Sequence, residues 1–406
     1  MAHGTANSPQ VLRRMNSGAV VRFALRVAEF TAAEVMAETS LTRATVLGVC
    51  DDLVEAGWLV ELEDSRAAGL TSKGRPARRY RLRDEAGVVA GIDAGEHRFT
   101  AIVADLRGKA LGEVGADAPA VDRRPGSAAE RSRAEAADER RALAVRLLDE
   151  ALAAAGARRD DLLVGVPAPV DADGRSPAGD RDYWKTMNPG FADALPGPSV
   201  VVENDANLAA VAEQSHDGQA HTANVATLLS GERLGAGVIV DGRLLRGARG
   251  GAGEMRFLDI VEGAGSPDGV GALARMWAQD ALAHGERSAL AELPVDEITA
   301  RDVFRAAADG DALAAGILDR LGDRIARVAL VLASLLDIER VVIAGAIAEA
   351  VEPVLARART VLAEEFYPPV PELVASTLGR DIVVRGAVES ARVRIREEPL
   401  AFEPRR

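Results

Sequence analysis

The sequence predicts an α/β protein in two parts: a small helical module with a β-hairpin, followed by a larger body of strands and helices. Three observations support this prediction. The chain has 406 residues, more than one hydrophobic core usually organises, so two or three domains are expected. Residues 17–83 show the order helix, helix, turn, helix and hairpin. From residue 88 onward the pattern changes to strands joined by tight turns and followed by helices.

The composition narrows the class of protein. Apolar residues make up 48% of the chain, which is typical of a globular protein, and no run of 18 apolar residues predicts a membrane span. The first ten residues, MAHGTANSPQ, lack the apolar stretch of a signal peptide, so a cytoplasmic location is expected. The single cysteine, Cys50, excludes a disulfide within the chain and a thiolate-rich metal site.

The first two helices are predicted from their apolar spacing and their caps. Residues 17–30 form a mostly apolar helix, with Ser17 as its expected N-cap. Thr31 with Glu34 three residues later has the spacing of a capping box, which opens a second helix over residues 32–39.

The third helix and the hairpin complete the module. After a short turn at residues 40–41, Thr42 opens a helix that ends at Gly57, a residue favoured just after a helix. Residues 58–64 and 77–83 are the expected strands of the hairpin. This order is typical of a winged helix-turn-helix, a DNA-binding fold.

Positive charge is concentrated in and just before the second strand of the hairpin. The segment Lys73–Arg83 places six cationic side chains in eleven residues of a chain whose formal net charge is -13. Residues 1–84 hold 12 Lys and Arg against 10 Asp and Glu, so the acidic remainder would repel DNA and contact should be confined to this module. One alternative is that the basic hairpin is only a solvated face. The expected DNA-binding residues, at the start of the third helix and in the wing, are Ser40, Thr42, Arg43, Thr45, Lys73, Arg75 and Arg78.

The body predicts two related halves, the second starting near Asn224. The first half opens with strands at 88–92, 99–104 and 110–114, a helix at 128–155, a strand and loop at 161–171, and a strand running into a helix at 199–214. The second half has a hairpin at 224–230 and 236–245, helices at 267–285 and 301–336, a strand at 339–347, a helix at 349–365 and a last strand at 381–388. The predicted domains are residues 1–84, 85–223 and 224–406.

Asn204 and Asp205 lie where a strand ends and a helix begins. Open α/β sheets bind ligands at such carboxyl ends. A carboxylate beside an amide could hydrogen-bond sugar hydroxyls, which need both donors and acceptors. The alternative is that one of the two residues simply caps the helix that follows.

Three segments resemble signatures of one family. Val202–Asn207 (VENDAN), Gly250–Glu254 (GGAGE) and Val166–Asp171 (VPAPVD) are similar to segments of the ROK family, which contains repressors, open reading frames and kinases. The resemblance covers residues 17–394 and implies an actin-like ATPase (ribonuclease H-like) fold of two lobes; a winged helix-turn-helix in front distinguishes the repressors from the kinases. The ligand-binding residues it implies are Asn204, Asp205 and Glu254, with Asp205 matching the general base of the kinases. Arg256 is a further candidate, at a position where the chain departs from the family.

The chain departs from the kinases at both phosphate loops. The family's DxGGTK segment is here Asp93–Arg98, with Glu96 in place of a glycine. The second loop, GTGIGGG in kinases, is here Gly231–Gly237 with Glu232 and an arginine. Bulk and negative charge at these positions act against nucleotide binding. The sequence therefore predicts a protein that is not an enzyme and has no cofactor.

The family's metal site is also absent. ROK proteins follow the glycine-rich segment with a histidine and a CxCGxxGC cluster, whereas this chain has Met255 and a segment, 262–271, without cysteine. Arg256 could instead contact an acidic or phosphorylated sugar. Trp184, beside Tyr183, lies where the family places a loop of the sugar cleft, although a plain packing role is an equal alternative.

These patterns favour a DNA-binding transcriptional regulator, a repressor of carbohydrate-uptake or catabolic genes that responds to a sugar or sugar derivative. One alternative is an ATP-dependent hexose kinase with an added N-terminal domain. Another is a DNA-binding regulator that needs no ligand. The expected partners are a palindromic double-stranded operator, the sugar, and a second copy of the chain in a homodimer or homotetramer, with no membrane.

Overall fold

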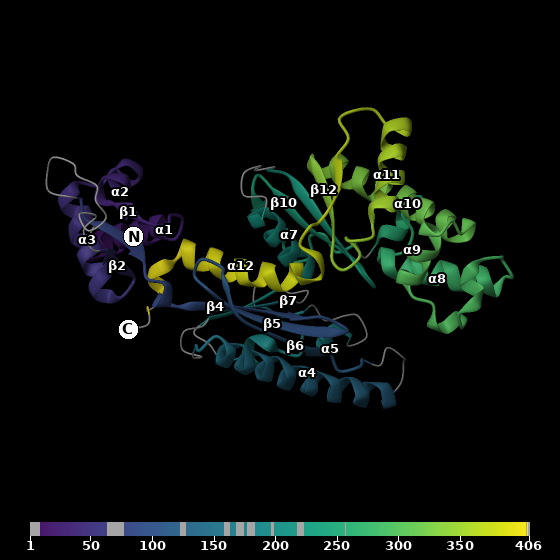
Figure 1. The fold of residues 1–406 in the computed structure, drawn as a ribbon, viewed down its shortest axis with the longest axis horizontal. Helices are drawn as coiled ribbons and strands as arrows, with labels where there is room; N and C mark the ends of the chain where they lie inside the picture. Colours follow the sequence, from purple (N-terminus) through teal and green to yellow (C-terminus); the bar gives the residue numbers. More distant parts are fainter. Residues whose placement is uncertain are drawn as a thin grey trace, which may run out of the picture.

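The computed structural model describes residues 9–62, 77–121, 127–157, 163–167, 174–176, 183–195, 199–216, 223–255, 257–402 and 404. Within these residues the chain forms one three-stranded sheet and two five-stranded sheets. The small sheet belongs to an N-terminal module at one end of the molecule, and the two larger sheets form the body (Figure 1). No helix in the described ranges combines the length and the apolar composition that a bilayer crossing requires.

The N-terminal module is a winged helix-turn-helix, as predicted. Its elements are α1 (Pro9–Ala24), β1 (Phe30–Thr31), α2 (Ala32–Thr39), α3 (Arg43–Ala56), β2 (Leu59–Leu62) and β3 (Arg79–Leu82), and its antiparallel sheet has the order β1-β3-β2. The capping box of Thr31 and Glu34 is present. Thr42 caps α3, and Gly57 ends it with a left-handed φ of 87°.

The prediction for the first helix was wrong at both ends. Helix α1 begins at Pro9 and ends at Ala24, so Ser17 lies inside the helix, 9% exposed, and caps nothing. Proline suits a first helical turn because its missing N–H would have no partner there. Phe30, placed in the helix from its apolar character, pairs with Tyr80 in the small sheet instead.

The first body sheet has the order β6-β5-β4-β7-β8. Its strands are β4 (Val88–Ala94), β5 (Arg98–Asp105), β6 (Ala110–Asp117), β7 (Leu163–Pro167) and β8 (Ser199–Glu203). The first three are antiparallel, and β4, β7 and β8 run parallel. Helix α4 (Ser127–Ala154) packs on β5 and β6, and the short helices α5 (Tyr183–Met187) and α6 (Phe191–Ala194) lie beside it. The three predicted strands and the long helix are confirmed.

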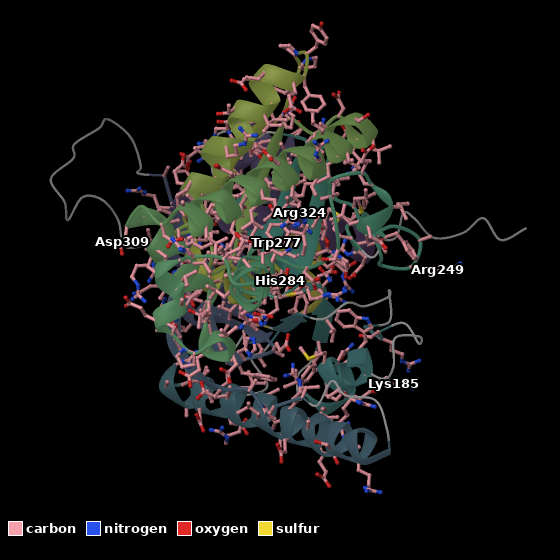
Figure 2. The ribbon with its side chains drawn as sticks, turned by 90° about the vertical axis from the view of Figure 1, so that its right-hand side faces the viewer. Lys185, Arg249, Trp277, His284, Asp309 and Arg324 are labelled. Atoms are coloured by element: carbon pink, nitrogen blue, oxygen red, sulfur yellow. The ribbon has the colours of Figure 1, made fainter. Side chains whose placement is uncertain are left out.

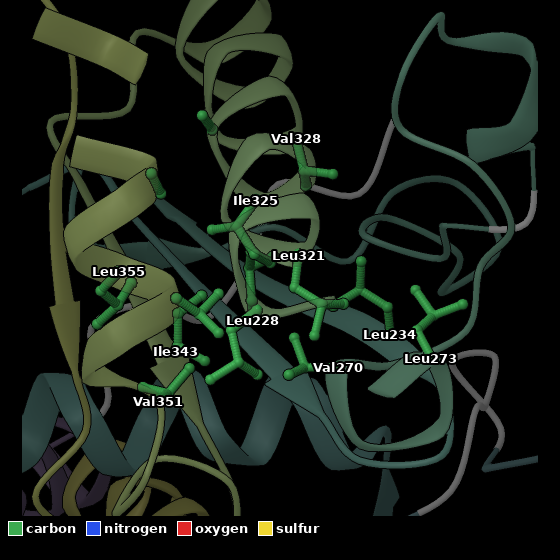
Figure 3. Close-up of a cluster of buried hydrophobic side chains, with 14 of the residues drawn as sticks. Leu228, Leu234, Val270, Leu273, Leu321, Ile325, Val328, Ile343, Val351 and Leu355 are labelled. Atoms are coloured by element: carbon green, nitrogen blue, oxygen red, sulfur yellow. The ribbon is translucent and has the colours of Figure 1, made fainter. Parts of the chain in front are cut away.

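The second body sheet has the order β11-β10-β9-β12-β13. Its strands are β9 (Val225–Ser230), β10 (Leu234–Val240), β11 (Arg243–Leu244), β12 (Arg340–Ala344) and β13 (Glu372–Ala375), and the helices beside it are α8 (Val270–Ala283), α9 (Ala300–Ala308), α10 (Ala312–Leu336) and α11 (Glu352–Glu365). The single helix predicted at 301–336 is two, because Asp311 caps a new helix after the turn at Gly310. Leu228 and Ile343 of the sheet pack against Leu321 and Ile325 of α10 in the largest apolar cluster (Figure 3).

The last strand, predicted at 381–388, is a helix. Helix α12 (Ile382–Glu397) lies between the first body sheet and α7 (Asp205–His216), and α7 in turn packs on the second sheet. The β-branched run Ile382–Val384 favours a strand by local propensity. The buried positions Val384, Val388, Ala391 and Ile395, however, follow the spacing of one helical face.

Helix α12 also reaches the N-terminal module (Figure 1). Val388, Ala391 and Ile395 belong to the same apolar cluster as Val20 of α1 and Leu53 of α3. We call this cluster the shared core. It crosses the predicted boundary between residues 84 and 85, so the division into three domains stays a prediction.

Polar contacts reinforce the shared core. Arg107, in the turn after β5, donates from Nη1 to the carbonyl oxygen of Val27 at 3.0 Å. Arg14 of α1 donates to the carbonyl oxygen of Leu400, beyond the end of α12, at 3.1 Å. The module is therefore also held on the body by hydrogen bonds from arginine side chains to backbone carbonyl oxygens.

Candidate functional site

A cavity of about 310 Å³ lies between the two body sheets. The end of β4, the start of α7, the loop after β9 and the start of α12 all contribute to its wall. A volume of this size suits a small ligand with a few converging polar groups. The polar and aromatic residues in its wall include Asp93, Glu96, Trp184, Asn204, Asp205 and Glu254.

Asn204 has two tasks. Its Oδ1 accepts hydrogen bonds from the backbone N–H of Ala206 at 2.9 Å and of Asn207 at 3.2 Å, so it caps α7. Its Nδ2 donates to Oε1 of Glu254 at 3.2 Å. The interpretation that Asn204 caps the helix is thus confirmed, and Asn204 and Glu254, both predicted to bind the ligand, lie together in the cavity wall.

A buried carboxylate fixes Asn204 from behind. Glu203, 5% exposed, accepts from Asn207 Nδ2 at 2.9 Å and from the backbone N–H of Asn204 at 3.0 Å. Its Oε2 accepts from Arg246 Nε at 2.7 Å. Charge-assisted bonds of this kind hold a site in one geometry. The sequence analysis missed Arg246, because no local pattern links it to a residue 43 positions earlier.

Glycine brings Glu254 to this place. Gly253 has a φ of 79°, and a Cβ there would meet the carbonyl oxygen of Ala236 at 1.8 Å. The backbone can therefore approach β10 closely, and Ala236 N donates to Gly253 O at 3.0 Å. A glycine at position 253 therefore allows the segment to pack against β10, and this places Glu254 within hydrogen-bond distance of Asn204.

Two carboxyl groups in the wall have raised pKa values. Burial, and after it the charge of Asp205, together raise the pKa of Asp93 to about 7, against the opposing effect of Arg140. Burial also raises the pKa of Asp205. Near neutral pH such a pair can offer both a hydrogen-bond donor and an acceptor to one ligand. The sequence analysis had assigned Asp93 only to a phosphate loop.

Arg140 of α4 supports this part of the wall. Its guanidinium is buried and donates to the carbonyl oxygens of Ala94 at 2.6 Å and Gly95 at 3.1 Å. It also lies 4.7 Å from the centre of the Phe99 ring. The turn after β4 is therefore tied to α4, and the position of Asp93 is tied with it.

On the side of the cavity that matches the second phosphate loop, several polar groups are hydrogen-bonded within the chain. Glu232, which the sequence analysis expected to act against nucleotide binding, accepts from Arg275 of α8 at 2.8 Å. The N-terminus of α8 could bind an anion, but Val270 N donates to Ser230 Oγ at 2.8 Å and Gly269 N donates to Glu232 O at 3.1 Å. These N–H groups are already used, so this helix end has less to offer a phosphate.

Two further residues were considered for ligand binding, Trp184 and Arg256, and one segment was compared with the family's metal site. Trp184 lies in α5 and lines the cavity, beside Met187. Arg256 lies outside the described residues. The segment 262–271 contains no cysteine or histidine, and in the part of the chain that the structure describes no group of His, Cys, Asp and Glu could hold a metal ion.

The predicted DNA-binding residues of α3 gather on its first turn. Thr42 Oγ1 accepts from Thr45 N at 3.3 Å, and the two hydroxyls lie 2.9 Å apart. Ser40 has a left-handed φ of 57° in the turn before the helix, and Arg43 is exposed. Short polar groups and a cation therefore stand at the end of the helix that would enter a DNA groove.

Of the three wing residues predicted to contact DNA, the structure describes Arg78. Lys73 and Arg75 lie outside the described residues. Arg78 Nε donates to Glu61 at 2.7 Å, its Nη2 donates to Asp51 at 2.6 Å, and its guanidinium lies 5.4 Å from the Tyr80 ring centre. Its charge is thus balanced inside the module, and a contact of Arg78 with DNA stays a prediction.

Comparison with known proteins agrees with this architecture. The sequence model of the ROK family matches residues 89–393. The DNA-binding transcriptional dual regulator NagC of Escherichia coli K12 is 25% identical over 355 residues, which cover 84% of this chain and 82% of that protein. A glucokinase of Halalkalibacterium halodurans is 30% identical over 205 residues, which cover 46% of this chain and 62% of the glucokinase.

The chain spans only 41 to 62% of the length of the first curated relatives that it matches. Among solved structures, a transcriptional regulator that is a homolog of the E. coli MLC protein superposes with a TM-score of 0.72 at 22% identity, over 96% of this chain and 98% of that one. This likeness confirms the predicted fold class, a winged helix-turn-helix before a two-lobed, actin-like α/β body. The relatives include both regulators and kinases.

Proposed function

Because the chain belongs to the ROK family, we propose that it is a DNA-binding transcriptional regulator of the repressor type that binds a sugar or sugar derivative in the cavity. One observation carries the proposal. Helix α12 contributes Val383 to the cavity wall and, three turns later, Ile395 to the shared core with the winged helix-turn-helix. The similarity to NagC supports the proposal, because it extends along 84% of the chain and so includes part of the N-terminal module as well as the body.

The cavity wall has the chemistry that a sugar needs. Asn204, Asp205 and Glu254 would accept from and donate to hydroxyl groups. Asn204 and Glu254 already share a hydrogen bond, so these groups are oriented before a ligand arrives. Trp184 offers an indole face against which the apolar side of a sugar ring could pack.

Coupling between the sugar and DNA would run along α12. Its 16 residues span about 24 Å at 1.5 Å per residue. A ligand that binds better to one position of this helix would favour that position, and the shared core would carry the shift to α3. In a dimer, a small rotation of each module would change the spacing between two half-sites of a palindromic operator.

The kinase alternative has specific support and specific opposition. Asp205 is retained, and the glucokinase relative is 30% identical. Glu232 and the α8 N–H groups, however, are occupied by contacts within the chain. We therefore place the regulator first, and an ADP-release assay with a panel of hexoses separates the two. Turnover that disappears in Asp205→Asn would establish the kinase.

The regulator is tested by DNA binding. Fluorescence anisotropy with duplexes from the DNA around the gene should reveal a salt-dependent complex. Arg43→Ala should weaken it by about 1–3 kcal/mol if Arg43 contacts a base. Arg301→Ala, which removes an exposed arginine of α9 in the body, is the matched control. If Arg43→Ala and the control bind the duplex with equal affinity, α3 is not the recognition helix.

A further inference from the structure

The segment 262–271, which we call the α8 loop because it leads into α8, occupies the place of the family's metal cluster. Its residues do not fit that metal. It offers two carboxylates, Glu262 and Asp268, and Asp268 already accepts from Ser266 Oγ at 2.7 Å. A structural zinc site needs four ligands, mostly sulfur or imidazole.

A single guanidinium holds the α8 loop instead. Arg324 comes from the middle of α10, and its side chain lies inside the second half of the body (Figure 2). Its Nε donates to the carbonyl oxygen of Ala264, and its Nη2 donates to those of Ser266 at 2.6 Å and Asp268 at 2.9 Å. Three alternate carbonyl groups of one loop thus converge on one cation.

The chemistry of arginine suits this arrangement. A guanidinium has five N–H donors in a rigid plane and no acceptor, so it can bond several carbonyl oxygens at fixed angles. Arg324 is only 3% exposed, and burial lowers its pKa to about 10. It remains protonated at neutral pH. Burying a charge is unfavourable unless hydrogen bonds offset it, and the three carbonyls supply them.

The α8 loop in turn shapes the cavity. Leu234 N, at the start of β10, donates to Pro267 O at 3.0 Å, and Gly269 N donates to Glu232 O at 3.1 Å. Pro267 itself lines the cavity. Arg324, which does not itself line the cavity, therefore fixes the loop that forms one side of it.

We propose that Arg324 takes the place of the family's metal: its guanidinium holds the α8 loop, and the cavity is built without a metal ion. Arg324 is a positioning residue. Its effect on ligand affinity rests on the proposed function, whereas its effect on the loop does not.

The test is hydrogen exchange on the full-length chain. Arg324→Met removes the donors and keeps the apolar stem, and should raise exchange in the α8 loop by about tenfold or more. Arg324→Lys should behave similarly, because a compact ammonium cannot span three carbonyls. Arg320→Met is the matched control, since Arg320 lies one turn earlier on α10 and stacks on Trp277 at 4.0 Å without a bond to the loop. Circular dichroism checks that each variant folds.

Two further experiments decide whether Arg324 or a metal ion holds the α8 loop. Methylguanidinium added to Arg324→Ala should restore protection of the α8 loop, whereas Zn²⁺ should not. Chelator treatment of the unmodified protein should leave the loop protected. Loss of protection on chelation, or an α8 loop in Arg324→Met as protected as in the Arg320→Met control, would overturn the proposal. If the unmodified protein binds no sugar, the proposed function fails, while the exchange result still judges Arg324.

Discussion

Replacement of Ile395 by alanine should weaken the N-terminal module, although the residue lies more than 300 positions further along the chain. Ile395 is 5% exposed and packs in the shared core with residues of α1 and α3. Truncating a buried isoleucine to alanine costs about 2–5 kcal/mol, from lost burial and from the cavity that remains. Because the void left by the shorter side chain would lie in the shared core with α1, the lost stability should be that of the N-terminal module.

This free energy converts into a measurable exchange rate. At about 1.4 kcal/mol per factor of ten, the opening equilibrium of the module should rise by roughly 30-fold to several thousand-fold. Hydrogen exchange of the most protected amides in α1 and α3 reports that equilibrium directly. DNA affinity should fall only when the open form becomes a sizeable fraction of the protein.

A matched change isolates the cause. Ile317 of α10 is also an isoleucine 5% exposed on a helix, but it belongs to the apolar cluster of the second body sheet. Ile317→Ala should reduce protection in that cluster and leave α1 and α3 as they are. If Ile395→Ala leaves α1 and α3 as protected as in the unmodified protein, the module has a complete core of its own, and the shared core is not a source of stability.

Three other changes test the cavity. Because the folded chain holds the Asp93 proton more tightly than the unfolded chain does, the free energy of unfolding should fall between pH 4 and about 7, by at most about 1.4 kcal/mol per pH unit. Denaturant titrations across this range should show the fall, and Asp93→Asn should flatten it. A rise in stability over the same range would contradict the raised pKa of Asp93. Glu254→Gln should reduce sugar affinity about tenfold in calorimetric titrations with little change in melting temperature, and unchanged affinity would exclude it from the ligand contact. Gly253→Ala should destabilise by about 1–3 kcal/mol, because its Cβ would meet Ala236 O at 1.8 Å, while Gly251→Ala, with open space around it, should unfold like the unmodified protein.

Several local signals were interpreted correctly in the sequence analysis, although the expected cap at Ser17 was not. The capping box at Thr31, the cap at Thr42 and the left-handed glycine at Gly57 each depend on neighbours within a few residues, and each is present. The place of Asn204 at the start of α7 is local in the same sense. Sequence patterns can predict such features because the interactions that create them lie within one turn of chain.

Features that depend on distant partners were missed. The segment predicted as a last strand is helix α12, because burial against a sheet and α7 outweighs the strand propensity of Ile382–Val384. Arg246 and Arg324 look like ordinary surface arginines in the sequence, and their partners lie 43 and about 60 positions away. Only the fold brings these charges to Glu203 and to the α8 loop, which support the cavity wall.

The shared core also has a consequence for how the protein is made. The winged helix-turn-helix leaves the ribosome early, yet α12, which completes its core, ends only at Glu397. At about 5–20 residues per second, the nascent module waits roughly 15 to 60 s for that helix. During this interval its apolar face is uncovered, so a newly synthesised chain should complete the core of its N-terminal module only after α12 has been translated.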